Sequence, residues 1–237
     1  MSGGYKYIML MASLPAPGPL FTEKQPPLSR LRVENRLRQL DEDDLIALQA
    51  IEDALEWRHV GADSDDADVL ERVRRAESMT TSETLRSVIK SRMDVRTCLA
   101  GLRRRAAGGE APPTDGSWGL GRLGRTIGRN WRAAAFGLER SHPWIKDADH
   151  LVTEGDAYGL ERLILETVDR DLRRRGALHQ FDLEAVVIYV LRWSLIDRWS
   201  RYNTEGASRR FARLLSDVLG SAAGLSARGR NHQEALI

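Results

Sequence analysis

Apolar residues recur every three or four positions along most of the chain, a spacing that predicts amphipathic helices. The first such pattern follows two prolines, Pro26 and Pro27, with Ser29 in a position to cap a helix. We expect helices within residues 26–40, 41–57, 63–79 and 82–105. No stretch after residue 26 alternates with period two, so the expected fold is mainly α.

The second half of the chain has the most regular patterns, within residues 155–176, 181–203 and 204–220. The middle pattern differs from its neighbours, because only Glu184 and Arg192 are charged between Leu183 and Ile196. A helix that is apolar on most of its sides is typical of the centre of a bundle. We therefore expect this helix to be buried.

The N-terminus contains an apolar run from Tyr7 to Leu14, which Pro15 and two further prolines end. About eight residues cannot span a bilayer, which needs about twenty. A signal peptide is the alternative, since Lys6 precedes the run, but no small-x-small cleavage site follows it. We interpret the run as a buried strand or other extended segment.

Residues 106–117 are rich in Gly, Pro and small polar residues and have no apolar period, which indicates a linker. The linker separates an N-terminal helical half, residues 1–105, from a C-terminal helical half, residues 118–219. Residues 220–237 are small and polar, so a mobile tail is expected there. The predicted architecture is all-α, with two helical bundles and a short extended N-terminal segment.

Three glycines directly after this linker, Gly119, Gly121 and Gly124, have the GxGxxG spacing of dinucleotide-binding loops. Such a loop needs a buried strand before it, which delivers the glycine turn to a helix N-terminus. No apolar strand precedes this run, and the apolar residues from Leu120 to Trp131 recur at helical steps. We therefore predict a glycine-containing amphipathic helix and no bound cofactor.

No residue pattern in the chain indicates catalysis or metal binding. Cys98 is the single cysteine, and its helical spacing from Val95 and Leu102 favours a buried thiol. The five histidines are scattered and none forms a recognised metal-ligand motif. The chain lacks a GxSxG motif, a P-loop and an ordered triad, so we expect neither an enzyme nor a metal site.

The charge balance argues against a dedicated polyanion-binding arm. The chain has 36 basic and 34 acidic residues, and residues 1–118 hold 17 and 19 of them. Nucleic acid is thus an improbable partner, although an arginine-rich helical surface that binds it is the alternative function. The residues that motivate this alternative are Arg103, Arg104, Arg105, Arg122, Arg125, Arg129, Arg132, Arg173, Arg174 and Arg175.

Several segments together resemble an uncharacterised family encoded beside the subunits of bacterial V-type (A-type) ATPases. They are YKYIMLMASLP at the N-terminus, NWRAAAFGLERSHPWIKDADHL, EGDAYGLERLILE, and FDLEAVVIYVLRWSLIDRWSRYN with Gly206 and Phe211. The match spans residues 5 to about 215. The stretch GRLGRTIGR is less typical of the family.

The resemblance implies an all-helical protein in the place of the C subunit, which couples the central shaft to the membrane ring. The partners would be subunits of the ATPase, with no small-molecule ligand. The protein would be cytoplasmic and peripheral to the inner membrane through that complex. Both a permanent subunit and an assembly partner fit this resemblance.

Large aromatic residues concentrate binding energy at protein interfaces, and arginine does so as well. The possible partner-binding residues are Trp131, Trp144, Arg192, Trp193, Arg198 and Trp199. Of these, Arg192, Trp193, Arg198 and Trp199 match the final helix of the family. Core packing is the alternative role for each tryptophan, and it is the more common one.

Overall fold

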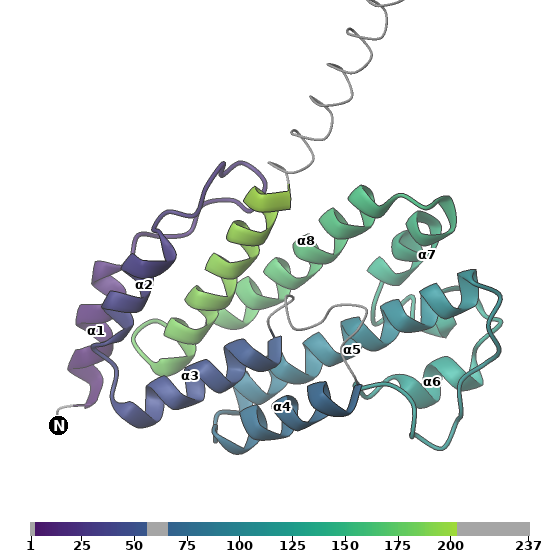
Figure 1. The fold of residues 1–237 in the computed structure, drawn as a ribbon, viewed down its shortest axis with the longest axis horizontal. Helices are drawn as coiled ribbons and strands as arrows, with labels where there is room; N and C mark the ends of the chain where they lie inside the picture. The colour runs from purple at the N-terminus through teal and green to yellow at the C-terminus, as the bar shows by residue number, and fades with distance from the viewer. Residues whose placement is uncertain (1–2, 56–65, 203–237) are drawn as a thin grey trace, which may run out of the picture.

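The computed structural model describes residues 3–55 and 66–202 (Figure 1). Gly206, Phe211, the pattern within residues 204–220 and the expected tail lie outside these ranges. All regular elements of the described ranges are helical, which confirms the predicted all-α class. They are α1 (Gly3–Ser13), α2 (Arg30–Leu37), α3 (Glu42–Leu55), α4 (Asp66–Ser78), α5 (Glu83–Ala106), α6 (Gly124–Arg129), η2 (Ala134–Gly137), α7 (Trp144–Glu154), α8 (Ala157–Gly176) and an unlabelled final helix over residues 183–202.

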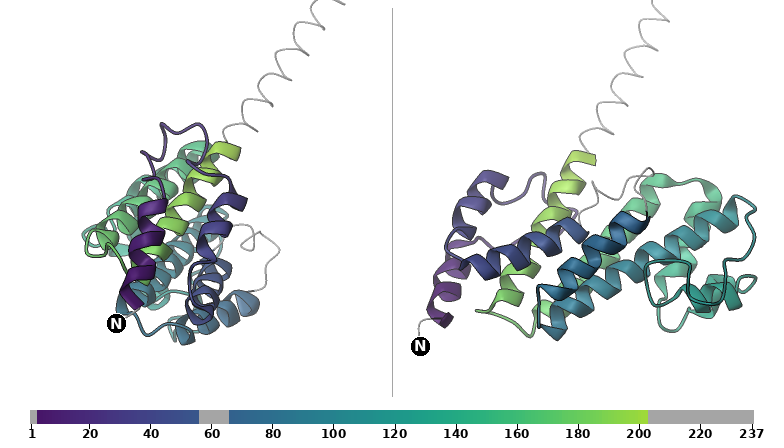
Figure 2. Two further views of the ribbon diagram at one scale, coloured as in Figure 1. Left: turned by 90° about the vertical axis from the view of Figure 1, so that its left-hand side faces the viewer. Right: turned by 60° about the horizontal axis from the view of Figure 1, so that its bottom comes forward.

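Helix α5 is the axis of the molecule. It contacts α3, α4, α6, α7 and α8, and it runs along the long dimension of the body (Figures 1 and 2). Helices α1 and α2 lie at one end of this dimension, and α6 lies at the other. Elements from distant parts of the sequence therefore meet along a single 24-residue helix.

The ends of α3 and α5 follow the charge pattern of the sequence. Helix α3 has three acidic residues in its first turn, where the helix dipole favours negative charge. At the start of α5 the Ser82 hydroxyl accepts a hydrogen bond from the Leu85 amide at 3.3 Å. Arg103, Arg104 and Arg105 form its last turn, where positive charge is favoured.

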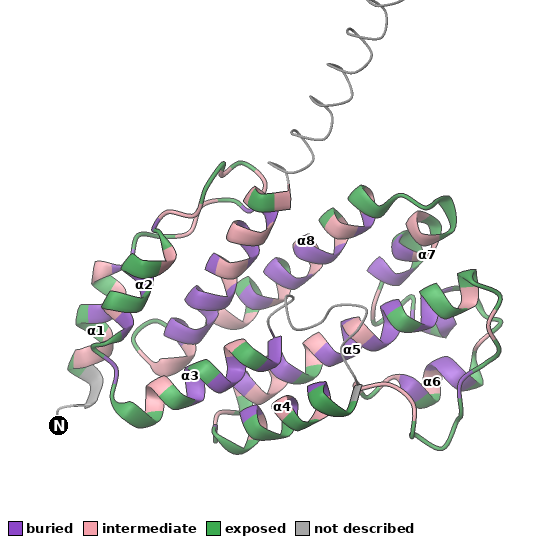
Figure 3. Cartoon of the chain, in the orientation of Figure 1, coloured by how far each residue is buried: buried purple, intermediate pink, exposed green. Residues whose placement is uncertain are grey.

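The buried apolar residues of the described chain form one cluster. It contains Leu85, Ile89 and Leu102 of α5 and draws further residues from both sides of the 106–117 segment (Figure 3). The final helix buries most of its perimeter, as the sequence predicted, with Val186 and Val190 fully covered. The core of the described chain is thus shared across the segment that the sequence identified as a linker.

The prediction of an extended N-terminal segment is wrong, because these residues form α1. Tyr, Met, Leu and Ala all fit a helix, and the run lacks the series of β-branched residues that favours a strand. Prolines from Pro15 onward end the helix, as expected. The irregular chain of residues 14–29 then leads to α2.

The predicted helix through the three glycines is also only partly correct. Residues 117–123 are irregular, and α6 begins only at Gly124. The loop of residues 107–117 is bonded to the body at both ends. Arg104 Nε donates to the Glu110 carbonyl at 2.7 Å, and Arg125 Nη2 donates to the Asp115 carbonyl at 2.8 Å.

Among the described helices, none combines the length and the apolar character that are needed to cross a membrane.

Candidate interaction sites

Three of the four tryptophans proposed as partner anchors are buried. Trp144, Trp193 and Trp199 expose 8, 3 and 5% of their surface. The Trp193 indole donates to the Leu28 carbonyl at 2.8 Å, and Trp199 packs edge-on against Phe21 with ring centroids 4.9 Å apart. Core packing therefore accounts for these three side chains, and their role at an interface stays a prediction.

Arg192 and Arg198 of the final helix bind carboxylates of α8. Arg192 Nε lies 2.8 Å from Asp169 Oδ1, while Arg173 Nε lies 2.9 Å from the other oxygen of this buried carboxylate. Arg198 pairs with Glu161 in the same way. Both arginines thus hold the final helix against α8. No pattern along the sequence indicates this pairing between helices.

The glycine run binds a carboxylate of its own chain. Asp94 and Thr97 of α5 are buried beneath it, with 2 and 1% of their surface exposed. The amides of Leu120 and Gly121 donate to Thr97 Oγ1 at 3.0 and 2.8 Å. The Arg122 amide donates to Asp94 Oδ1 at 2.7 Å, and its guanidinium binds Oδ2. These amides therefore have internal acceptors.

Close approach explains the glycine at position 121. A Cβ atom there would lie 2.6 Å from Asp94 Oδ1 and 2.7 Å from the Asp94 Cα, closer than atoms can pack. At Gly124 a Cβ atom would lie 2.3 Å from the Trp118 carbonyl oxygen. The spacing of a nucleotide fingerprint arises here from packing of a loop against α5.

An uncovered apolar face on α1 is a feature that the sequence analysis missed. Tyr5, Ile8 and Met9 expose 68, 42 and 53% of their surface. The sequence predicted an extended, buried segment here, and in that conformation the three residues do not form one exposed face. In a helix their spacing brings them together on one side. The opposite face is anchored to α3, where Lys6 and Tyr7 both bind Asp44, at 2.6 and 2.7 Å.

Further exposed apolar residues lie on neighbouring elements. Leu31 of α2, which contacts α1, is 66% exposed. Leu178 and Phe181 are exposed on the loop between α8 and the final helix, which lies at the same end of the long axis as α1 (Figures 1 and 2). An exposed apolar helix face such as that of α1 is typical of surfaces that bind another protein.

A cleft of about 620 Å³ between α5, α7 and α8 is lined by both charged and apolar side chains. Asp171 lies 2.6 Å from Arg174 and 2.8 Å from Arg175, and these bonds overcome the effect of its burial and lower its pKa. Burial lowers the pKa of Arg92 to about 9, and the charge of Arg198 adds to this effect. Most charged side chains of the cleft pair with one another. The cleft therefore indicates no particular ligand.

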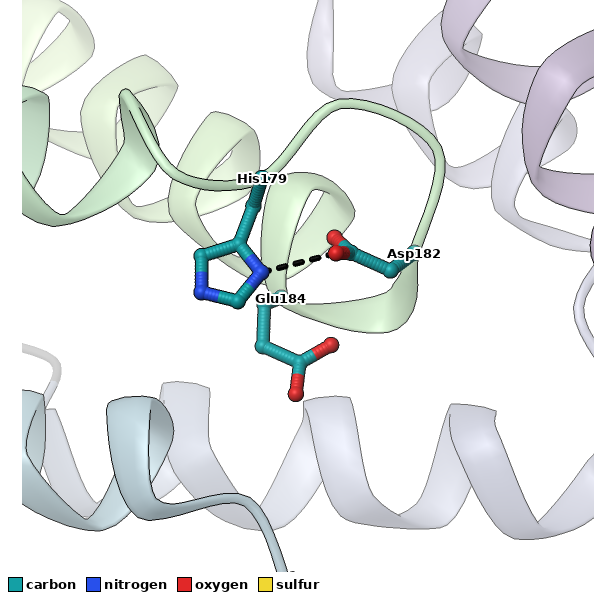
Figure 4. Close-up of side chains that lie close together, drawn as sticks. All are labelled: His179, Asp182 and Glu184. Atoms are coloured by element: carbon teal, nitrogen blue, oxygen red, sulfur yellow. Dashed lines mark hydrogen bonds and ion pairs between the residues drawn. The ribbon is translucent and has the colours of Figure 1, made fainter.

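His179, Asp182 and Glu184 form a half-buried group whose possible ligand atoms lie within 4.8 Å of one another (Figure 4). His179 Nδ1 lies 2.7 Å from Asp182 Oδ2, and its Nε2 lies 3.1 Å from Thr84 Oγ1. Asp182 Oδ1 accepts from the Ala185 amide at 2.9 Å. A metal ion would displace the bond between His179 and Asp182 close to two helix N-termini, which disfavour positive charge. We interpret the group as a cap for the final helix.

Cys98 is buried, as its spacing predicted, and burial raises its pKa to about 12. A protonated, covered thiol is a poor nucleophile.

No protein-family model, curated protein or solved structure matched the chain in our comparisons.

Proposed function

We propose that this protein is a non-catalytic helical component of a bacterial V-type ATPase, either a C-like coupling subunit or an assembly partner. The observation that carries this proposal is the uncovered apolar face of α1, formed by Tyr5, Ile8 and Met9. The sequence resemblance supplies the identity of the complex. The all-helical body and its internally bonded charged residues are compatible with a role in protein binding.

The face of α1 fits an apolar helix face that carries acidic residues at its edge. Helix α2 contacts α1 and adds Arg32 and Arg36, and Arg38 follows at its C-cap. In the described ranges no carboxylate lies within 4 Å of these three arginines. An apolar centre with a basic border is complementary in charge to an acidic amphipathic helix.

A coupling element must transmit force without unfolding, and a long helix with contacts on several sides suits this requirement. Helix α5 contacts five other helices, so a partner held at the α1 end would act on a continuous body. Torque would pass through side-chain packing and ion pairs. No chemical step is required of the protein in this mechanism.

The test is the stoichiometry of the full-length chain in purified, intact V-type ATPase from the cells that express it. A ratio near one to one with the shaft subunit supports a permanent subunit, and presence only in incomplete complexes supports an assembly partner. Absence from both would overturn the proposed function.

A matched pair of variants tests the α1 face in the same experiment. The double substitution Ile8→Asp and Met9→Asp is expected to reduce co-purification at least tenfold, because charge replaces an apolar contact. Met79→Asp is the control, since Met79 is also exposed but follows α4. Circular dichroism of both variants checks that the helices persist. Equal retention of both variants would show that the protein binds through another surface.

A further inference from the structure

A local excess of positive charge lies around the C-terminal end of α5 and α6. Residues 103–132 contain seven arginines and two acidic residues, although the whole chain carries a formal charge of only +2. This basic segment lies at the end of the long axis opposite α1 (Figure 1). The near-equal numbers of basic and acidic residues in the whole chain therefore conceal a strong local excess of positive charge.

An open hollow of about 730 Å³ lies within this basic segment and is lined by Arg105, Arg129, Trp131 and Arg132, together with Glu110. Arg129 and Arg132 are exposed. No carboxylate of residues 3–55 or 66–202 lies within 4 Å of either guanidinium. Two cations that line one hollow, with neither paired to a carboxylate, favour an anionic ligand.

The third arginine, Arg105, has a structural role and fixes the wall of the hollow. Its guanidinium lies 2.9 Å from Asp149 Oδ2 and donates to the Trp131 carbonyl at 3.0 Å. It also lies 4.3 Å from the centre of the Phe136 ring. Arg105 thus holds the chain that carries Trp131, while Arg129 and Arg132 remain available to a ligand.

Trp131 lines the same hollow and adds a flat aromatic surface to it. It is half-buried, and its ring stacks on Phe136 with centroids 5.7 Å apart and an interplanar angle of 20°. Because Phe136 is fully buried, it holds the indole in place. A positioned aromatic ring beside free guanidinium groups is the arrangement with which proteins bind a base and its phosphate.

We propose that this hollow binds a phosphate group carried on a planar ring system, the chemistry shared by nucleotides and single-stranded nucleic acids. Arg129 and Arg132 bind the phosphate, and the ring stacks on Trp131. This binding goes beyond the proposed role in the ATPase and does not depend on it. A lipid headgroup would satisfy the arginines but would leave Trp131 without a stacking partner.

The test measures fluorescence anisotropy of a fluorescein-labelled twelve-nucleotide single strand on the full-length chain, with unlabelled ATP and inorganic phosphate as competitors. The double substitution Arg129→Ala and Arg132→Ala is expected to weaken binding at least tenfold. It should also reduce the slope of log affinity against log salt by about 1.4, since each phosphate contact on a single strand contributes about 0.7. Arg74→Ala with Arg75→Ala, two exposed arginines of α4, is the matched control.

Competition by ATP and by phosphate distinguishes a nucleotide from a single-stranded nucleic acid as the ligand. Displacement by ATP but not by phosphate indicates a nucleotide site, and resistance to both indicates a longer single strand; either result supports the proposal. It is overturned if wild-type protein does not bind at low salt, or if the Arg129 and Arg132 variant binds as tightly as the control. Phosphatidylglycerol vesicles that bind through the same arginines, in place of the oligonucleotide, would also overturn it.

Discussion

Gly121 lies against the backbone of Asp94, where a Cβ atom would be 2.7 Å from the Asp94 Cα. Gly121→Ala must therefore push the loop away from α5 and weaken its hydrogen bonds to the buried Asp94 carboxylate. We expect the free energy of unfolding to fall by about 1 to 3 kcal/mol, the usual cost of overpacking. Urea denaturation measures this change.

Gly18→Ala is the control for this substitution, because a Cβ atom there would meet only the flexible side chain of Glu23. That side chain can move aside, so the cost should stay within about 0.5 kcal/mol. Equal effects of the two substitutions would show that the loop adapts freely to a larger residue at position 121.

The Tyr189 hydroxyl is buried and has no hydrogen-bond partner among the described residues. Burial also raises the pKa of this hydroxyl. Removing an unbonded polar group from the interior avoids its desolvation cost, so Tyr189→Phe should leave stability unchanged or raise it by about 1 kcal/mol. Thermal and urea denaturation check this, and a clear loss of stability would show that the hydroxyl has a partner.

Burial of single residues was the property that the sequence predicted best. Cys98 lies on the apolar face that its spacing indicated, and it is fully covered. Residue spacing within one helix defines such a face, because every third or fourth side chain points the same way. The contact between Arg192 and Asp169 joins two helices, and nothing in the local pattern indicates which residues meet there.

At the scale of elements, the ion pair between Asp169 and Arg192 joins α8 to the final helix, while the pair between Asp169 and Arg173 lies within α8. Asp169→Ala would leave Arg192, whose side chain is only 16% exposed, without its carboxylate. Breaking a buried ion pair from one side costs about 3 to 5 kcal/mol. We expect a loss of this size in urea denaturation.

Arg170→Ala provides the comparison on the same helix. Arg170 pairs with Glu166, but its side chain is 68% exposed, so solvent screens the pair. The expected cost is below about 1 kcal/mol. If both substitutions proved equally mild, the final helix would not depend on the pair between Asp169 and Arg192 for its position.

Elements with a long, regular apolar period were predicted well, and short or irregular ones were not. The pattern within residues 82–105 became α5, with bounds that differ by one residue at each end. The run in α1 is too short for its period to separate helix from strand. The turn at η2 has left-handed φ angles of 44° at Ala135 and 56° at Phe136. Neither residue type favours that conformation, so packing of Phe136 determines it.

At the scale of the whole molecule, contacts across the 106–117 segment suggest that neither half folds alone. The hydrogen bond from Trp193 to the Leu28 carbonyl spans 165 residues, and Asp94 of the first half holds Arg122 of the second. Fragments 1–117 and 118–237 should each lack cooperative thermal unfolding by circular dichroism. Cooperative unfolding of either fragment by itself would support the two independent bundles expected from the sequence.

The sequence predicted the all-α class but not the arrangement of the helices. Glycines, prolines and the absence of an apolar period correctly placed a loop at residues 107–117. Those features describe only the loop itself, whereas its packing against the body follows from contacts such as that between Arg125 and Asp115. A loop that is bonded on both sides joins the two parts of the chain closely.

The Arg122 amide in the glycine run and the Asp94 carboxylate that accepts its hydrogen bond belong to the same polypeptide. Any free anion would have to compete with a tethered carboxylate, whose effective concentration is on the order of millimolar or above even for a flexible tether. Here the tether is α5 itself, which keeps Asp94 beneath the Arg122 amide at 2.7 Å. The glycine run thus resembles a receptor with a built-in competitor. Loss of that carboxylate would free only the Arg122 amide, because Thr97 would still hold the amides of Leu120 and Gly121.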